Sequence, residues 1–114
     1  MDRLTLLQQA IIAVIDGYIT EHAHSESLRE LNYEKVIDAQ NFHFQLIRLG
    51  WKDRQRIFNL LFHVDIIDNK IWIQEDNLEY SVAERLTEQG ISKKDIVLAY
   101  FTASHRQYTE YAVS

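Results

Sequence analysis

The chain has 114 residues, of which 46% are hydrophobic, and its 17 acidic and 12 basic residues give a formal net charge of −5 at pH 7. This length predicts one domain, residues 1–114, built around a single hydrophobic core. The sequence contains no cysteine, which excludes disulfide bonds, thiolate metal sites and a cysteine nucleophile.

The sequence shows no signal for export or for membrane insertion. Met1-Asp2-Arg3 lacks the basic start of a signal peptide, and no apolar run reaches the ~18 residues that span a bilayer. We therefore expect a soluble, cytoplasmic protein. Basic residues form only small groups, at residues 52–56 and at Lys93-Lys94. Because proteins bind phosphate backbones with clustered Lys and Arg, direct nucleic-acid binding is disfavoured.

The first predicted element is an amphipathic helix over residues 2–22. Apolar residues recur there at spacings of three and four, at Leu4, Leu7, Ile11, Val14, Ile15, Tyr18 and Ile19. Residues 23–32 are mostly polar and predict a loop. His22 and His24 could bind a metal ion, but without a third fixed ligand we favour a solvated loop.

Two further segments, residues 33–38 and 42–51, predict a β-hairpin because the second alternates between apolar and polar side chains. Residues 56–67 predict a long third strand, whose even positions from Phe58 to Ile66 are apolar and expected to face the core. The length of this strand predicts a bulge or a strong twist. Helices should cover mainly one face of the antiparallel sheet.

A two-residue turn at Asp68-Asn69 joins the long strand to a fourth strand, because Asp and Asn tolerate the positive φ of tight hairpin turns. The short turn fixes the register, and the predicted pairs are Ile67–Lys70, Ile66–Ile71, Asp65–Trp72, Val64–Ile73 and His63–Gln74. This register separates the side chains by character, since successive residues point to opposite faces. The apolar face holds Val64, Ile66, Ile71 and Ile73. The polar face holds His63, Asp65, Trp72 and Gln74.

Beyond Asp76 the apolar period changes to about four, which predicts a second helix with Asn77 as N-cap and Gly90 at its C-terminal end. Residues 96–101 are almost all apolar and predict a further strand buried on both faces. The last residues keep aromatic and apolar side chains, so we expect an ordered C-terminal tail. The predicted fold is α+β: an N-terminal helix, an antiparallel β-meander of about four strands, a second helix, a further strand and the tail.

Two arrangements of polar residues invite a catalytic interpretation. Asp65, Asp68 and Lys70 are similar in type to the two carboxylates and the lysine of metal-dependent nucleases. The predicted register opposes this interpretation, because Asp68 lies in the turn and Lys70 points to solvent. His63 and Asp65 could orient a proton transfer, but no serine or cysteine nucleophile pattern accompanies them. We therefore predict no catalytic residue, no metal and no cofactor.

Several segments in the second half of the chain resemble one known family. They are Gly50-Trp51, residues 63–76 with the run His-x-Asp-Ile-x-Asp-x-Lys-Ile-Trp-Ile-Gln-x-Asp, residues 90–98, Arg106 and residues 111–113. Together they are similar to the XisI family, the cyanobacterial fdxN element excision controlling factors. The likeness covers residues 50–113, while the N-terminal helix fits in length and pattern. The chain departs from the family pattern at Asn69, Ser92 and Ala99, where the family usually has Gly, Pro and Gly.

The resemblance implies an accessory role in the programmed excision of a DNA element during heterocyst development, in which a separate recombinase cuts and rejoins the DNA. It also implies a XisH-like companion protein as partner, with the recombinase as a second candidate. The leading hypothesis is a non-enzymatic control factor that works through protein–protein contacts. The alternatives are a metal-dependent nuclease-like protein and a direct DNA-binding protein. The latter would need a basic strip assembled from Arg48, Lys52, Arg54 and Arg56.

Under the leading hypothesis, the polar face belongs to an interaction face made of His63, Asp65, Trp72, Gln74 and Arg106, since Trp with nearby polar groups is typical of interface anchors. An alternative of equal weight is that the C-terminal tail covers this face, with Arg106 paired to Asp65. Exposed sheet edges would also permit a homo-oligomer.

Overall fold

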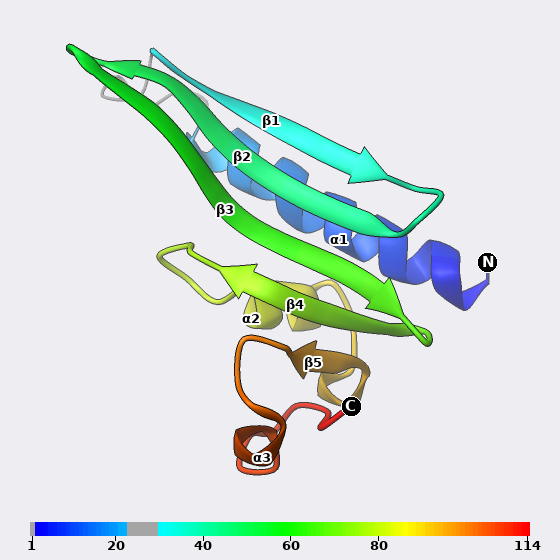
Figure 1. The fold of residues 1–114 in the computed structure, drawn as a ribbon. Helices are drawn as coiled ribbons and strands as arrows, with labels where there is room; N and C mark the ends of the chain where they lie inside the picture. Colours follow the sequence, from blue (N-terminus) through cyan, green and yellow to red (C-terminus); the bar gives the residue numbers. More distant parts are fainter. Residues whose placement is uncertain (1, 23–29) are drawn as a thin grey trace.

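The computed structural model describes residues 2–22 and 30–114, in which helices flank one sheet (Figure 1). The elements are α1 (Arg3–His22), β1 (Leu31–Asp38), β2 (His43–Lys52), β3 (Gln55–Ile67), β4 (Lys70–Asp76), α2 (Val82–Glu88), the 3-10 helix η2 (Lys93–Asp95), β5 (Ile96–Leu98) and α3 (Ala103–Arg106). The five strands lie in the order β1-β2-β3-β4-β5, antiparallel up to β4, whereas β5 runs parallel to β4. The predicted α+β fold is confirmed. Within the described residues, no helix combines the length and the apolar character needed to cross a membrane.

Helix α1 packs against the sheet through the apolar stripe that the sequence predicts. Its buried residues are Leu7, Ala10, Ile11, Val14, Ile15 and Tyr18. The Asp2 carboxylate accepts a hydrogen bond from the Thr5 backbone N–H at 2.8 Å, which caps the first turn. Because full burial of a Leu or Ile side chain stabilises a fold by ~1.5–3 kcal/mol, this stripe fixes the helix on the sheet.

The core lies between one face of the sheet and the helices α1 and α2. The sheet contributes Phe44, Leu46, Leu61, Phe62, Val64, Ile66, Ile71 and Ile73, and α2 contributes Val82, Ala83 and Leu86. Both helices lie on the same side of the sheet in Figure 1, as the sequence predicts. We call the opposite side the open face. By register and alternation it carries Val36, His43, Gln45, Phe58, His63, Asp65 and Trp72.

Strand β3 contains the predicted bulge, and the bulge changes which residues face the core. A register shift in the β2–β3 ladder leaves Leu61 as the extra residue, and Leu61 and Phe62 are both buried. The alternation therefore reverses on the N-terminal side of Leu61. Phe58 points to the open face and is 65% exposed, so the prediction that it faces the core is wrong.

The turn at Asp68-Asn69 is present, and its two residues have φ values of 51° and 61°, as a tight primed turn requires. Four of the five predicted pairs are found: Ile67–Lys70, Ile66–Ile71, Asp65–Trp72 and Val64–Ile73. The fifth is wrong, because a second register shift pairs His63 with Glu75 and leaves Gln74 as an extra residue of β4.

The first loop is shorter than predicted. The expected loop covered residues 23–32, but Leu31 already belongs to β1 and is buried. Residues 23–29, and with them the metal-binding alternative that involves His24, lie outside the described residues. His22 is hydrogen-bonded through Nδ1 to the backbone carbonyl one turn earlier in α1, at 2.8 Å.

The second helix begins later than predicted. Helix α2 starts at Val82, and Ser81 is its N-cap, accepting an N–H of the first turn at 3.2 Å. Asn77, the predicted cap, instead donates its side-chain amide to a backbone carbonyl of β3 at 3.0 Å. The Asp76 carboxylate accepts the Val82 N–H at 2.9 Å, which fixes the helix start against the end of β4.

The predicted strand over residues 96–101 is shorter in the structure. Strand β5 ends at Leu98, because the chain turns there and the Phe101 N–H donates to the Leu98 carbonyl at 3.1 Å. The three residues of β5 are buried as expected, whereas Tyr100 is 42% exposed. The tail is ordered as predicted, and Ala112 forms a bridge to β5.

Candidate functional site

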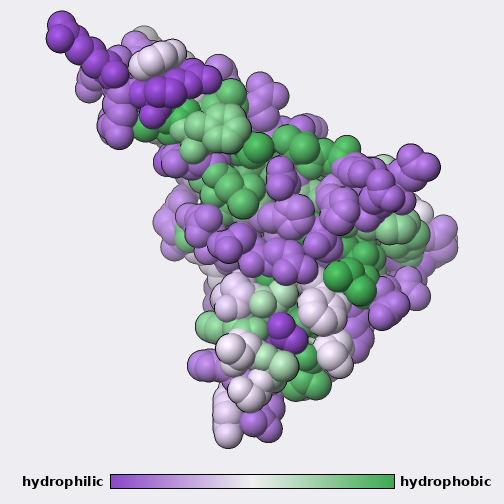
Figure 2. All heavy atoms as spheres, viewed as in Figure 1, coloured by the Kyte–Doolittle hydropathy of each residue, from purple (hydrophilic) through white to green (hydrophobic). Residues whose placement is uncertain are grey.

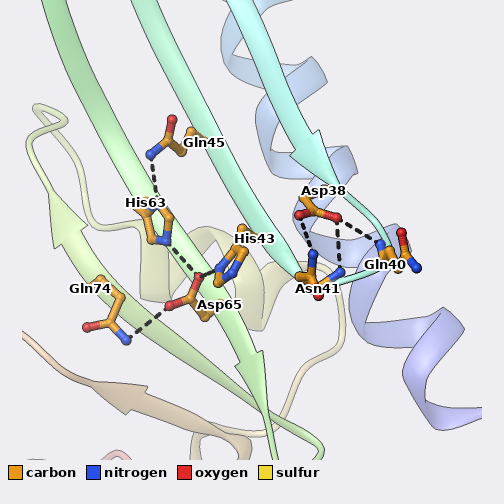
Figure 3. Close-up of polar contacts among 8 residues, drawn as sticks. All are labelled: Asp38, Gln40, Asn41, His43, Gln45, His63, Asp65 and Gln74. Atoms are coloured by element: carbon orange, nitrogen blue, oxygen red, sulfur yellow. Dashed lines mark hydrogen bonds and ion pairs between the residues drawn. The ribbon is translucent and has the colours of Figure 1, made fainter.

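A group of polar side chains meets on the open face where β2, β3 and β4 lie side by side (Figure 3). We call these residues the histidine cluster: His43, Gln45, His63, Asp65 and Gln74. The register of β2 and β3 places His43 opposite Asp65 and Gln45 opposite His63. Side chains two residues apart on one strand share a face, so both pairs point to the open side.

The Asp65 carboxylate is the centre of the cluster. Its Oδ1 atom accepts a hydrogen bond from His43 Nδ1 at 2.6 Å and another from His63 Nε2 at 2.6 Å. Gln74 Nε2 donates to the second oxygen, Oδ2, at 3.3 Å. Gln45 Nε2 lies 2.9 Å from His63 Nδ1, so both nitrogens of the His63 ring have a partner. Two of these four bonds hold the imidazole rings against one carboxylate oxygen, and the two glutamines hold the other oxygen and the second nitrogen of His63.

Burial and charge differ across the cluster. The side chains of Asp65 and His63 are 14% and 20% exposed, whereas that of His43 is 52% exposed. The hydrogen bond to Asp65 raises the pKa of His43, against the desolvation that lowers it, and the charges of Asp65 and Asp38 raise it further. His43 is therefore the more exposed of the two imidazoles, and its ring is held by the Asp65 carboxylate at 2.6 Å.

The rim of the cluster is built by the β1–β2 turn. The Asp38 carboxylate accepts hydrogen bonds from the backbone N–H groups of Gln40 and Asn41 at 3.1 and 3.0 Å, and from the Asn41 amide at 2.9 Å (Figure 3). The Asn41 bonds lower the pKa of Asp38, so this carboxyl group stays ionised. A shallow pocket of about 330 Å³ lies over this region, lined by Val36, Asp38, His43, Gln45 and His63.

The bulge at Leu61 creates this arrangement. On its N-terminal side Ile47 pairs with Leu60, and without the extra residue the same ladder would place His43 opposite Val64. His43 would then share the apolar face of β3. The bulge shifts the ladder by one residue and brings His43 to Asp65.

The predicted residue Trp72 lies beside the histidine cluster, directly opposite Asp65 on β4, and Arg106 lies next to it in α3. The Arg106 guanidinium is 5.4 Å from the centre of the Trp72 ring. Arg106 also donates to three backbone carbonyls of the C-terminal tail, those of Phe101 at 3.1 Å and of Ala99 and Val113 at 3.5 Å. The tail therefore reaches Trp72 by way of Arg106, which pairs with tail carbonyls and not with Asp65.

The nuclease-like residues are not brought together. Among the described residues, the group that could hold a metal ion consists of His43, His63 and Asp65, without Asp68. Asp68 lies in the exposed turn, and Lys70 donates to the Ser114 carbonyl at 2.6 Å.

The basic strip required by the DNA-binding alternative is not assembled either. By strand alternation Arg48 and Arg56 lie on opposite faces of the sheet. Arg48 donates to Asn59 at 3.0 Å, and the Arg56 guanidinium lies 5.5 Å from the centre of the Trp51 ring.

Comparison with known proteins identifies the family. The sequence model of the XisI protein family matches residues 1–113. The chain belongs to the XisI family. Among curated proteins, none matches this sequence.

Two solved XisI structures share the fold. A XisI-like protein from Anabaena variabilis is 30% identical, with a TM-score of 0.76, and the match covers 95% of this chain and 99% of that one. The fdxN element excision controlling factor XisI from the same organism is 26% identical, with a TM-score of 0.77, and the match covers 99% of this chain and 100% of that one.

Membership of the XisI family extends the resemblance seen in residues 50–113 over the N-terminal helix. The departure at Asn69 is accommodated by the fold, because Asn tolerates the φ of 61° that this turn position has. At Ser92 the side chain caps η2 by accepting the Lys94 N–H at 3.2 Å.

Proposed function

We propose that this XisI-family protein is a control factor for the excision of a DNA element, which acts in the cytoplasm by binding other proteins and does not itself cut DNA. The observation that carries the proposal is the family match over residues 1–113. It is supported by a fold shared with a protein described as an fdxN element excision controlling factor.

The open face is the surface we assign to partner binding. Besides the histidine cluster it carries large apolar side chains that are exposed, namely Val36, Trp51 and Phe58 at 45%, 50% and 65%. Figure 2 shows hydrophobic side chains gathered among polar ones on this face, over the three long strands. Exposed apolar groups bordered by polar ones are typical of protein interaction surfaces.

The partner we propose is a XisH-like protein, with a site-specific recombinase as a second candidate. The net charge of −5 on the whole chain disfavours a DNA backbone as the ligand of this protein, because an excess of negative charge repels phosphate. The predicted residues His63, Asp65, Trp72 and Gln74 contribute polar and aromatic contacts to the same surface, and Arg106 fixes the edge beside the tail.

Excision in the native host tests the function. Deleting the gene should abolish the appearance of the rejoined DNA junction, and a plasmid copy should restore it. Purified protein with Mg²⁺ should leave the element intact, and a XisH-like protein should co-purify with it. Normal excision in the deletion strain, or cleavage by the purified protein alone, would refute the proposal. Binding of duplex DNA at low salt, lost at high salt, would favour the DNA-binding alternative.

Trp72 distinguishes an interaction face from a face covered by the tail. We expect Trp72→Ala to weaken co-purification of the XisH-like protein while the thermal unfolding curve stays close to that of the wild type. Loss of the folded state would show instead that the Trp72–Arg106 contact is structural. Arg106→Lys is the matched variant, because it keeps the charge but loses the planar contact with the ring.

A further inference from the structure

We propose that His43, His63 and Asp65 form a binding site for a divalent transition metal ion of the Zn²⁺ type. The proposal rests on the geometry of the histidine cluster and is independent of the control role. Two imidazoles and one carboxylate are a common ligand set for such ions, which favour nitrogen donors more than Mg²⁺ or Ca²⁺ do.

The ligand atoms already converge. One donor atom from each of the three residues lies within 4.8 Å of the other two. Both imidazole nitrogens are 2.6 Å from Asp65 Oδ1. In a tetrahedral zinc site, bonds of ~2.0–2.2 Å place ligand atoms ~3.3 Å apart. The ion would take the place of the shared protons, and the ligands would separate by less than ~1 Å, which side-chain rotation supplies.

The neighbouring amides support the ligands in the way that metal sites require. A metal-bound imidazole usually donates its other N–H to an acceptor, which orients the ring. Gln45 faces His63 Nδ1 at 2.9 Å, and a half-turn of its amide would present the oxygen as that acceptor. Gln74 holds Asp65 Oδ2 at 3.3 Å and leaves Oδ1 to face the ion.

The backbone holds the three ligands in a fixed arrangement. His43 and Asp65 are directly opposite on β2 and β3, and His63 precedes Asp65 by two residues on the same face. Ligands on paired strands lose little conformational freedom when an ion binds. The pocket of about 330 Å³ beside His43 leaves room for water or a partner side chain as a fourth ligand. Three protein ligands with one open position therefore describe the site.

The ligand set also predicts which ions the site rejects. Mg²⁺ and Ca²⁺ prefer oxygen ligands, and this group offers one carboxylate beside two imidazoles. Zn²⁺ should therefore bind much more tightly than Mg²⁺, and Co²⁺ should bind well enough to act as a spectroscopic substitute.

The experiment uses the full-length chain without a polyhistidine tag, stripped of metal with a chelator. Zn²⁺ titrated into the protein against a chromophoric chelator should show one saturable equivalent. His43→Asn and Asp65→Asn should each raise the Kd at least tenfold. His105→Asn is the matched control, because His105 stacks on Phe101 at 4.5 Å in the tail and should leave the Kd unchanged.

A readout on the wild type keeps the proposal testable if a variant fails to fold. Proton NMR should show the ring signals of His43 and His63 shifting with one equivalent of Zn²⁺, while those of His105 stay in place. Gln45→Leu should weaken Zn²⁺ binding by about 10-fold or more, as loss of an outer-shell partner does in known sites. Absence of saturable binding, binding unaffected by both ligand variants, or equal binding of Mg²⁺ would overturn the proposal.

Discussion

Gly50 shows how a single residue constrains the start of the sheet. It lies in β2 opposite Leu31 with a φ of +145°. A Cβ atom at this position would lie 2.2 Å from the Glu30 carbonyl oxygen and 3.1 Å from the Leu31 Cα. Both neighbours are backbone atoms, so the strand itself would have to move. Gly17 offers the opposite case, because a Cβ there would have no neighbour within 4 Å and the residue lies inside α1.

Alanine substitutions at these two glycines should have opposite effects. Gly50→Ala should lower the free energy of unfolding by about 3 kcal/mol, through the contact with the Glu30 carbonyl and the unfavourable φ. Gly17→Ala should raise it by about 0.5–1 kcal/mol, since Ala is the better helix former. Urea unfolding monitored by circular dichroism measures both. Equal effects of the two substitutions would contradict the described backbone at Gly50.

Tyr18 and Tyr80, which pack in or against the core, predict a loss of folding stability at alkaline pH. Burial raises the pKa of Tyr18 to about 12, with the charge of Glu79 adding to the shift, and burial likewise raises the pKa of Tyr80 to about 12. The protonated phenols therefore favour the folded state, and this stability is complete below the ordinary pKa of 10.0 and lost as the pH rises through about 12. Ultraviolet absorbance measured against pH should show tyrosines that ionise only near pH 12. The Tyr18→Phe variant should have one such tyrosine fewer. Titration of all six tyrosines near pH 10.0 would contradict this.

At the scale of elements, the hairpin of β3 and β4 could be predicted where a short turn fixes it. Asp68-Asn69 leaves two residues between the strands, so the pairs nearest the turn follow directly. The length of β3 predicts a bulge, but the positions of the bulges at Leu61 and Gln74 could not be predicted, because periodicity does not show which residue is extra. Leu60, Leu61 and Phe62 are all apolar, so either alternation satisfies the core.

The same limit explains what the sequence could show of the candidate site. His63, Asp65 and Gln74 could be placed on one polar face because they lie within the hairpin whose turn the sequence predicts. His43 and Gln45 could not be added, since their register against β3 depends on the bulge at Leu61. The third ligand of the proposed metal site, His43, could therefore be identified only from the three-dimensional structure.

Substitutions at Asn69 test the backbone conformation of the turn between β3 and β4. Asn69→Gly should raise the free energy of unfolding by about 0.5 kcal/mol, because Gly adopts positive φ without a steric cost. Asn69→Val should lower it by about 1–2 kcal/mol, since a β-branched side chain is disfavoured at the φ of 61°. Both keep the backbone carbonyl that accepts the Arg3 guanidinium at 3.0 Å. Thermal unfolding of the two variants checks this order of stability. A Val variant as stable as the Gly variant would contradict the positive φ of Asn69 in the turn.

The whole molecule is a one-sided sheet. Helices α1 and α2 bury one face, while the open face carries the histidine cluster and the exposed apolar residues Val36, Trp51 and Phe58 (Figures 1 and 2). A single bulge contributes to both features, because it brings His43 to Asp65 and turns Phe58 outward. This arrangement leads us to assign partner binding to the open face.

The most direct test of this assignment is the affinity of the purified protein for its proposed XisH-like partner, compared between two matched variants. Phe58→Glu changes an exposed apolar residue of the open face, and Leu6→Glu changes one on α1, where Leu6 is 51% exposed. With both variants folded, we predict that Phe58→Glu raises the Kd at least tenfold, a loss of about 1.4 kcal/mol of binding free energy, and that Leu6→Glu leaves the Kd within twofold of the wild type. An unchanged Kd for Phe58→Glu, or an equal loss in both variants, would contradict the role of the open face.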